Sequence, residues 1–266
     1  MQITPSTQVV NVGGIPIGGK NFVVIAGPCS IESYDQFLET ASGVKSAGAN
    51  LLRGGIWKMR TSAKSFQGLG HDAFSMIKDV CQKTGMKLVS EVTDAKQIEM
   101  IDDLVEMYQV GSRNMHNYSL LKELGQQKKP VLLKRGFAAL IDEWVKSAEY
   151  IMHGGNNNII LCERGIRTFE TATRNTLDLN AVVFAKKNTH LPVVVDPSHA
   201  VGIRALVPDL AIASAAAGAD GLIIEVHPRP AEALSDGMQA LTLGDFNTMM
   251  KKLERVLEAV DRPLLK

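Results

Sequence analysis

Long apolar runs are absent from this sequence. No stretch approaches the roughly 20 consecutive apolar residues that a membrane helix needs, and the first ten residues, MQITPSTQVV, have neither the basic nor the apolar region of a signal peptide. Cysteine is also scarce, because Cys29, Cys81 and Cys162 form neither a CxxC motif nor a pairing framework. These absences argue against a membrane protein and predict a reducing, cytoplasmic setting.

An excess of charge of either sign is missing as well. The chain has 29 Lys and Arg residues against 28 Asp and Glu residues, a net charge of +1 at pH 7. Overall charge therefore gives no support to a nucleic-acid or membrane-surface role, and any cationic site must be local. Low-complexity segments and linkers are also lacking. With 266 residues, 45% of them hydrophobic, we expect one domain with a sizeable core.

The sequence does contain a repeated pattern of short apolar runs that end in polar residues. Eight runs occur: FVVIAGPC, LLRGG, LVSEV, YQVGSR, PVLLKR, IILCER, PVVVDPSH and GLIIEVH. Their Val, Ile and Leu residues do not alternate with polar ones, which is typical of parallel strands buried on both faces. Amphipathic segments lie between them, as over residues 34–48, 72–85, 95–107 and 138–155. The pattern predicts a (β/α)8 TIM barrel over residues 21–266, since about 250 residues is typical of that fold.

Residues 1–20 predict a short N-terminal β-hairpin extension. The pairs Gly13-Gly14 and Gly18-Gly19 flank an apolar segment, so the hairpin is expected to plug the bottom of the barrel or to contact a neighbouring subunit. A doubly wound α/β sheet is the alternative fold, but it usually has fewer strands, and no GxGxxG follows the first run. Left-handed glycines are expected at four helix C-termini: Gly48, Gly85, Gly125 and Gly154.

Four residues with metal-ligand chemistry stand at or just past the ends of three runs. Cys29 follows the first run, His199 ends the seventh, Glu225 lies in the eighth, and Asp236 lies in the loop after it. Taken singly, Cys29 is more often a buried hydrophobe, and His199 is as readily a structural histidine as a ligand. In a closed barrel, however, strand eight lies beside strand one, which brings these ends together. A thiolate, an imidazole and two carboxylates suit a divalent ion such as Mn, Fe, Co or Zn, and suit Mg or Ca poorly.

Cations also gather at or just past the ends of the runs. They are Arg53, Lys58, Arg60, Arg113, Lys134, Arg135, Arg164 and Arg167. Some are expected to be solvated surface charges, but Arg53 and Lys134 extend strongly apolar strands. Converging cations repel one another unless an anion neutralises them, so the cluster predicts a polyanionic substrate. The segment LLRGGIWKMRTSAKSFQGLG, which includes Thr61 and Ser62, predicts a phosphate cradle without a Walker pattern.

Glu91, in SEVTD, has two interpretations of equal weight. Its carboxylate orients a water or a cation at the site, or it caps the next helix. His227, in EVHP, is expected to be structural, and neither Cys81 nor Cys162 carries a functional signal.

Nine segments, in their order along the chain, closely resemble the 3-deoxy-7-phosphoheptulonate (DAHP) synthases. They are AGPCSIES, RGGIWKMRTSAKSFQGLG, SEVTD, QVGSRNMHN, VLLKRG, LCERGIRTFE, VVVDPSHA, IIEVHP and SDGMQAL. The resemblance is to the compact branch related to 3-deoxy-D-manno-octulosonate 8-phosphate synthase, and it covers residues 22–246. That family has a (β/α)8 barrel, in agreement with the prediction from the apolar runs.

The resemblance implies a metal-dependent transferase of the shikimate pathway that condenses phosphoenolpyruvate with D-erythrose 4-phosphate. The family's metal ligands carry over to the four residues already proposed. Its phosphoenolpyruvate-binding residues carry over to Arg53, Lys58, Arg113, Lys134 and Arg164. The erythrose 4-phosphate end carries over to Arg60, Thr61 and Ser62. Lys58 is the candidate for proton transfer, with Glu91 as its helper.

Two rival functions remain at this stage. One is the octulosonate enzyme, which uses arabinose 5-phosphate, and the other is a non-catalytic, phosphate-binding regulatory subunit. Met59 stands where the family's Lys-Pro-Arg-Thr-Ser motif has proline, which loosens that turn and bears on the sugar preference. The resemblance also suggests a homodimer or homotetramer. No fused regulatory domain is expected, and a separate regulatory partner stays open.

Overall fold

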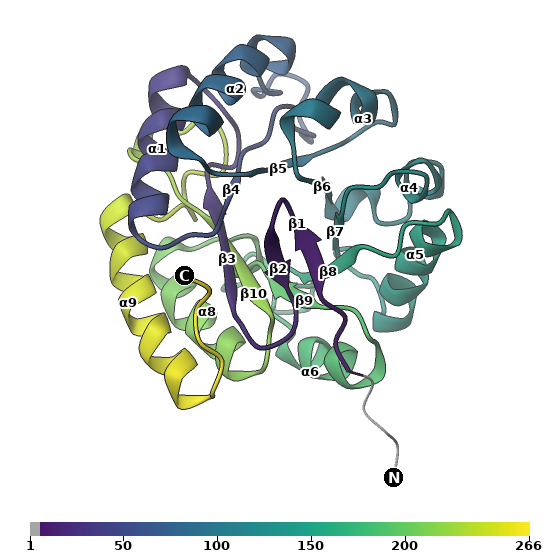
Figure 1. Cartoon of the computed structure of the whole chain (residues 1–266). Coiled ribbons are helices and arrows are strands. Elements are labelled where there is room, and N and C mark those ends of the chain that lie inside the picture. The colour runs from purple at the N-terminus through teal and green to yellow at the C-terminus, as the bar shows by residue number, and fades with distance from the viewer. Residues whose placement is uncertain (1–5) are drawn as a thin grey trace.

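The computed structural model describes residues 6–266, so the first five residues of the predicted hairpin extension lie outside the described part. Within it, eight parallel strands close a barrel in the order β10-β3-β4-β5-β6-β7-β8-β9 (Figure 1). Their bounds are β3 Val23–Gly27, β4 Leu51–Arg53, β5 Leu88–Glu91, β6 Met107–Val110, β7 Val131–Lys134, β8 Ile159–Glu163, β9 Val193–Val195 and β10 Gly221–Glu225. The predicted (β/α)8 fold is confirmed.

Helices surround the barrel (Figure 1). They are α1 Tyr34–Ser46, α2 Ala73–Thr84, α3 Lys96–Ile101, α4 Tyr118–Gly125, α5 Ile141–His153, α6 Leu179–Asn188, α7 Pro197–Val201, α8 Val207–Ala216 and α9 Leu243–Ala259. Short 3₁₀ turns span Gly70–Asp72, Asp102–Leu104, Ser112–Asn114, Arg204–Leu206 and Pro230–Glu232. Side-chain caps begin several helices; Ser33 accepts from the Gln36 N–H at 3.2 Å at the start of α1. None of the helices within residues 6–266 is both long and apolar enough to cross a bilayer.

Each strand buries both of its faces. Val23 and Ile25 of β3 point into the barrel, whereas Val24 and Ala26 pack outward against the helices. Because both faces are covered, the strands show no polar alternation in sequence. Alternation still fixes which side chains face the barrel axis.

The hairpin fills the bottom of the barrel. Strands β1 (Val10–Val12) and β2 (Ile15–Ile17) pair antiparallel and lie within the ring of strands in Figure 1. The side chains of Val10, Val12 and Ile17 are fully buried and pack against the inward residues of the barrel. This plug leaves the opposite, C-terminal end of the strands as the open face.

The glycine prediction is right at two positions and wrong at two. Gly48 (φ 95°) and Gly85 (φ 69°) are left-handed, as predicted. Neither Gly125 nor Gly154 is among the residues with positive φ. These two glycines instead allow the ends of α4 and α5 to touch: a Cβ on Gly125 would lie 2.7 Å from the Ile151 carbonyl oxygen. Close helix packing therefore requires glycine there.

Val10→Ala should lower the free energy of unfolding by about 2 kcal/mol, since it removes two methyl groups from a buried position. The same change at Val9, which is 53% exposed, should stay within about 0.5 kcal/mol of the parent protein. Equilibrium urea unfolding measures both values. Equal losses for the two variants would contradict the packing of the hairpin inside the barrel.

Candidate metal and anion site

Strand ends at the open face bring the four predicted metal ligands together. Cys29 lies two residues past β3, and Glu225 ends the neighbouring strand β10. His199 lies in the short helix α7 after β9, and Asp236 lies in the loop between β10 and α9. One ligand atom from each of the four residues lies within 4.8 Å of the other three. They form a possible metal site.

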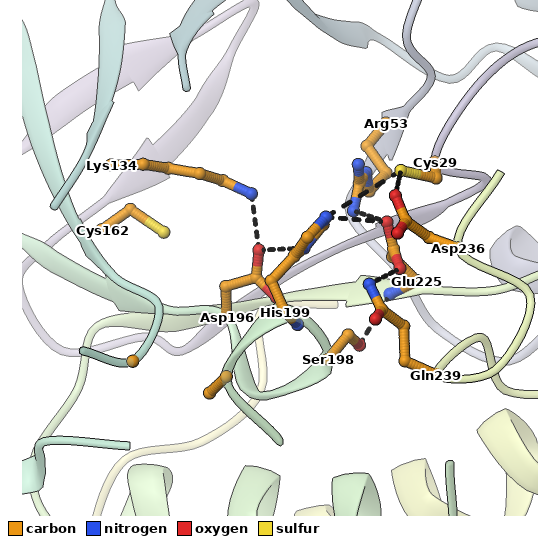
Figure 2. A network of polar contacts seen from close by, with 12 residues as sticks. Cys29, Arg53, Lys134, Cys162, Asp196, Ser198, His199, Glu225, Asp236 and Gln239 are labelled. Atoms are coloured by element: carbon orange, nitrogen blue, oxygen red, sulfur yellow. Dashed lines mark hydrogen bonds and ion pairs between the residues drawn. The ribbon is translucent and has the colours of Figure 1, made fainter. Parts of the chain in front are cut away.

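The donor atoms converge from three sides (Figure 2). The Cys29 Sγ lies 3.0 Å from Asp236 Oδ2 and 3.9 Å from His199 Nε2, and His199 Nε2 lies 3.1 Å from Glu225 Oε1. Asp236 has φ 53°, a left-handed conformation that is uncommon outside glycine. Non-glycine residues of this kind cluster at functional sites, where the surrounding structure holds them.

Neighbouring polar groups orient the donors. Asp196, the residue after β9, caps α7 by accepting the His199 backbone N–H at 2.9 Å, and its Oδ2 lies 2.7 Å from His199 Nδ1. A carboxylate at Nδ1 favours the tautomer whose free lone pair is on Nε2, the atom that faces the other donors. Gln239 Nε2 donates to Glu225 Oε2 at 2.5 Å, which fixes that carboxylate as well.

Burial sets the protonation of the donors. Burial, with the negative charge of Glu225, raises the pKa of the Cys29 thiol above its ordinary value. Burial also lowers the pKa of His199, which favours the neutral imidazole that binds metals. Burial alone would raise the pKa of Asp236, but the charge of Lys58 holds it well below its usual range. Neutral imidazole, ionised carboxylate and a thiol that a metal would deprotonate fit a divalent first-row ion.

An anion-type cavity adjoins the four donors. It has a volume of about 300 Å³, and its wall includes two of them, His199 and Asp236. All the predicted substrate-binding residues line it: Arg53, Lys58, Arg60, Thr61, Ser62, Arg113, Lys134 and Arg164. Glu91 also lines this cavity, and α3, which begins at Lys96, has no side-chain cap at Ala95.

Several buried polar atoms in the cavity have no protein partner within the described part of the chain. They are Arg60 Nη1, Arg164 Nη1 and Ser112 Oγ. Arg164 is 3% exposed, and its burial lowers the pKa of the guanidinium. The guanidinium also lies 4.8 Å from the ring centroid of Phe137, but a buried charged nitrogen without a hydrogen bond is costly, so this arrangement favours a bound anion that completes its hydrogen bonds.

Two of the eight predicted cations do not line the cavity. Arg135 points outward, where its Nη1 contacts Glu163 Oε2 at 3.0 Å and Asp178 Oδ2 at 2.8 Å. The Arg167 guanidinium lies 4.9 Å from the ring centroid of Phe137. Alternation along the strands explains Arg135, because Lys134 before it faces the barrel axis.

Sequence reasoning missed several residues of the site, among them Arg174 and Asp196. Arg174 lines the cavity and donates to Gln239 Oε1 at 2.9 Å, although it lies eleven residues past β8, in a loop that folds back where Ile166 pairs with Thr176. Such a position gives no strand-end signal. Asp196 did give one, since it directly follows the run VVV, three residues before His199.

Comparisons with known proteins give one family model and relatives with two named activities. A sequence model described as the DAHP synthetase I family matches residues 2–262. The phospho-2-dehydro-3-deoxyheptonate aldolase of Thermotoga maritima is 46% identical over 256 residues, which cover 96% of this chain and 76% of that protein. The 2-dehydro-3-deoxyphosphooctonate aldolase of Nitrobacter winogradskyi is 32% identical over 274 residues, which cover 95% of this chain and 94% of that protein.

A solved structure agrees with these sequence similarities. The truncated form of 3-deoxy-D-arabino-heptulosonate 7-phosphate synthase from Thermotoga maritima matches with a TM-score of 0.91 and 42% identity. The match covers 98% of this chain and 95% of that one.

Cys29→Ala should remove the thiolate signal of a bound metal. Added Co²⁺ is expected to give a sulfur-to-metal charge-transfer absorption in the parent protein, because a soft thiolate is one of the donors. Cys81→Ala, which removes a thiol on α2 instead, is the matched control and should keep the absorption. Parent-level absorption in Cys29→Ala would contradict the proposed ligand set.

Arg164→Met and Arg135→Met should have opposite effects, although each arginine directly follows a strand. Arg164→Met should weaken the binding of inorganic phosphate about tenfold or more, through loss of a charged hydrogen bond, without lowering stability. Arg135→Met should lower the free energy of unfolding by about 3–5 kcal/mol, because it leaves Glu163 and Asp178 without their cation. Phosphate titration and urea unfolding measure the two effects. If Arg135→Met weakened phosphate binding and Arg164→Met lowered the free energy of unfolding, the assignment of Arg164 to the cavity and of Arg135 to a structural ion pair would be refuted.

Proposed function

The chain belongs to the DAHP synthetase I family, and we propose that it condenses phosphoenolpyruvate with D-erythrose 4-phosphate. The products would be 3-deoxy-D-arabino-heptulosonate 7-phosphate and phosphate, so the chain would be a carbon–carbon bond-forming transferase at the first step of the shikimate pathway. One observation carries the proposal: a cavity with buried guanidinium nitrogens of Arg60 and Arg164 that lack a hydrogen-bond partner adjoins four convergent metal-type donors.

Burial supports a deep site for phosphoenolpyruvate. Arg53, Lys134 and Arg164 are 3–4% exposed and line the inner part of the cavity. The planar guanidinium groups of the two arginines and the compact ammonium group of Lys134 suit a carboxylate and a phosphate held close together. Arg113, which also lines the cavity, adds a fourth cation. The departing phosphate would then leave as an anion already neutralised by these side chains.

The exposure of the Arg60-Thr61-Ser62 segment supports the placement of erythrose 4-phosphate nearer the opening of the cavity. Thr61 and Ser62 are exposed, and Arg60 is partly buried. The unusual Met59 in this segment presents its backbone carbonyl to Arg113 Nη1 at 3.4 Å. Proline would offer the same carbonyl, so this link does not depend on the residue type. We infer that Met59 leaves the preference for the four-carbon sugar in place.

The donors would hold a divalent ion beside both substrates. Such an ion, bound by Cys29, His199, Glu225 and Asp236, would supply a Lewis acid for the aldehyde oxygen. Cys29 and Asp236 raise the pKa of Lys58 against the lowering effect of burial, so its ammonium stays protonated. Lys58 would donate that proton to the aldehyde oxygen as C3 of phosphoenolpyruvate bonds to C1 of the sugar.

Water completes the reaction. A water molecule adds to C2 of the former phosphoenolpyruvate, and the bond from C2 to the phosphate oxygen breaks, so one water is consumed and one phosphate is released. Glu91 ends β5, and its carboxylate lines the cavity with Gln109 Nε2 at 3.4 Å. We propose that Glu91 accepts a proton from this water. Holding both substrates in one cavity supplies proximity in addition.

The octulosonate reaction is the rival, since a relative with that name is 32% identical. The Arg60-Thr61-Ser62 segment favours the four-carbon sugar. Parallel assays of phosphate release should therefore give a kcat/KM for erythrose 4-phosphate about tenfold or more above that for arabinose 5-phosphate. Cys29→Ala should lose turnover with added Mn²⁺, whereas Cys81→Ala should keep it.

Each other outcome of these assays has a distinct meaning. A preference for arabinose 5-phosphate would replace the proposed substrate by that of the rival. No phosphate release with either aldehyde would favour the non-catalytic, phosphate-binding alternative. Substantial turnover in Cys29→Ala would refute the role of that thiol.

A further inference from the structure

Ion pairs connect the metal-type donors to cations of the cavity. Arg53 Nη1 lies 3.1 Å from Glu225 Oε1, and Asp236 pairs with Lys58 Nζ at 3.4 Å and with Arg174 Nη1 at 3.5 Å. In these pairs the cation touches a donor residue directly. Another connection runs through an intermediate, because Lys134 reaches His199 only by way of Asp196 (Figure 2).

Asp196 uses a single oxygen for both neighbours. Its Oδ2 lies 2.5 Å from Lys134 Nζ and 2.7 Å from His199 Nδ1. Its other oxygen accepts the His199 backbone N–H. The Asp196 side chain is fully buried, and that of Lys134 is 5% exposed, so solvent screens these contacts little. Lys134 lines the anion cavity, whereas His199 is one of the four donors.

We propose that Asp196 is a positioning residue through which a divalent ion at His199 and an anion at Lys134 strengthen each other's binding. An ion at Nε2 withdraws electron density from the imidazole, which makes Nδ1–H a stronger donor to the shared oxygen. Asp196 then holds Lys134 less tightly, so more of the ammonium charge is available to an anion. An anion at Lys134 should likewise strengthen the binding of an ion at His199 by the same factor, because coupling between two binding equilibria is reciprocal.

This inference deepens the proposed function and rests on it, since the anion is phosphoenolpyruvate. It concerns a different quantity, however. The proposed function requires that both ligands bind and react, whereas the inference concerns the ratio of metal affinities with and without the anion.

Asp196→Asn separates the charge of Asp196 from its structural role. Asparagine caps helices as well as aspartate does, so the start of α7 should persist. The matched control is Asp178→Asn. Asp178 also caps a helix, accepting the Ala181 N–H at 3.0 Å, and also pairs with a buried cation, Arg135. It lies outside the cavity wall, so its loss should not alter the coupling.

Isothermal titration calorimetry gives the dissociation constant of Mn²⁺ with and without saturating phosphoenolpyruvate. The parent protein should bind Mn²⁺ about fivefold or more tightly with phosphoenolpyruvate present. Asp178→Asn should keep this ratio. Asp196→Asn should lose most of it and retain only the direct attraction between the ion and the anion. An unchanged ratio in Asp196→Asn, or a ratio of one in the parent, would overturn the inference.

A second pair of variants covers the case in which Asp196→Asn does not fold. Lys134→Met and Arg164→Met each remove one buried positive charge from the same cavity. Only Lys134 contacts Asp196, so Lys134→Met should tighten Mn²⁺ binding without phosphoenolpyruvate more than Arg164→Met does. Equal effects would refute the role of Asp196. If the parent binds neither ligand, or binds both without turnover, the proposed function fails instead.

Discussion

The balance of buried charge at the open end of the barrel is the constraint on which the site depends. Metal-type donors and the carboxylate of Asp196 stand at the ends of β3, β9 and β10, and buried cations face them from β4, β7 and β8. Each group alone would be strongly destabilised by burial. Together they form pairs at hydrogen-bonding distance, such as Arg53 with Glu225 and Lys134 with Asp196. A metal ion would bind Glu225 directly and reach Asp196 through His199, whereas an anion would bind Arg53 and Lys134, which is why one site suits both.

The fold supplies this balance through geometry. Parallel strands send their last inward residues to one face, and closure of the barrel makes β10 a neighbour of β3. Side chains two residues apart on a strand face the same side, and the site follows this rule. Leu51, Ile223 and Val194 point inward, and two residues after them come Arg53, Glu225 and Asp196. The hairpin closes the other end with apolar side chains, so the polar chemistry is confined to one face.

Much of this was predictable because strand ends are fixed by the fold. The eight strands, the donors at strand ends and several cavity cations could be proposed from the apolar runs, whereas Asp236 came from the loop after the last run. Inward or outward orientation could not, because strands buried on both faces lack polar alternation; Arg135 and Arg164 therefore looked equivalent. Arg174 depends on the path of a long loop, and Gly125 with Gly154 reflects the approach of two helices. Contacts between distant segments of this kind leave no local pattern in the sequence.

The most direct test of the charge-balance account is a crystal soaked with Mn²⁺ and phosphoenolpyruvate, measured near the manganese absorption edge. The account predicts one anomalous peak within bonding distance of the Cys29 thiolate, the His199 imidazole and the carboxylates of Glu225 and Asp236. The anion should contact Lys134 and Arg164 beside it. A peak elsewhere, or an anion bound away from those two cations, would contradict the account.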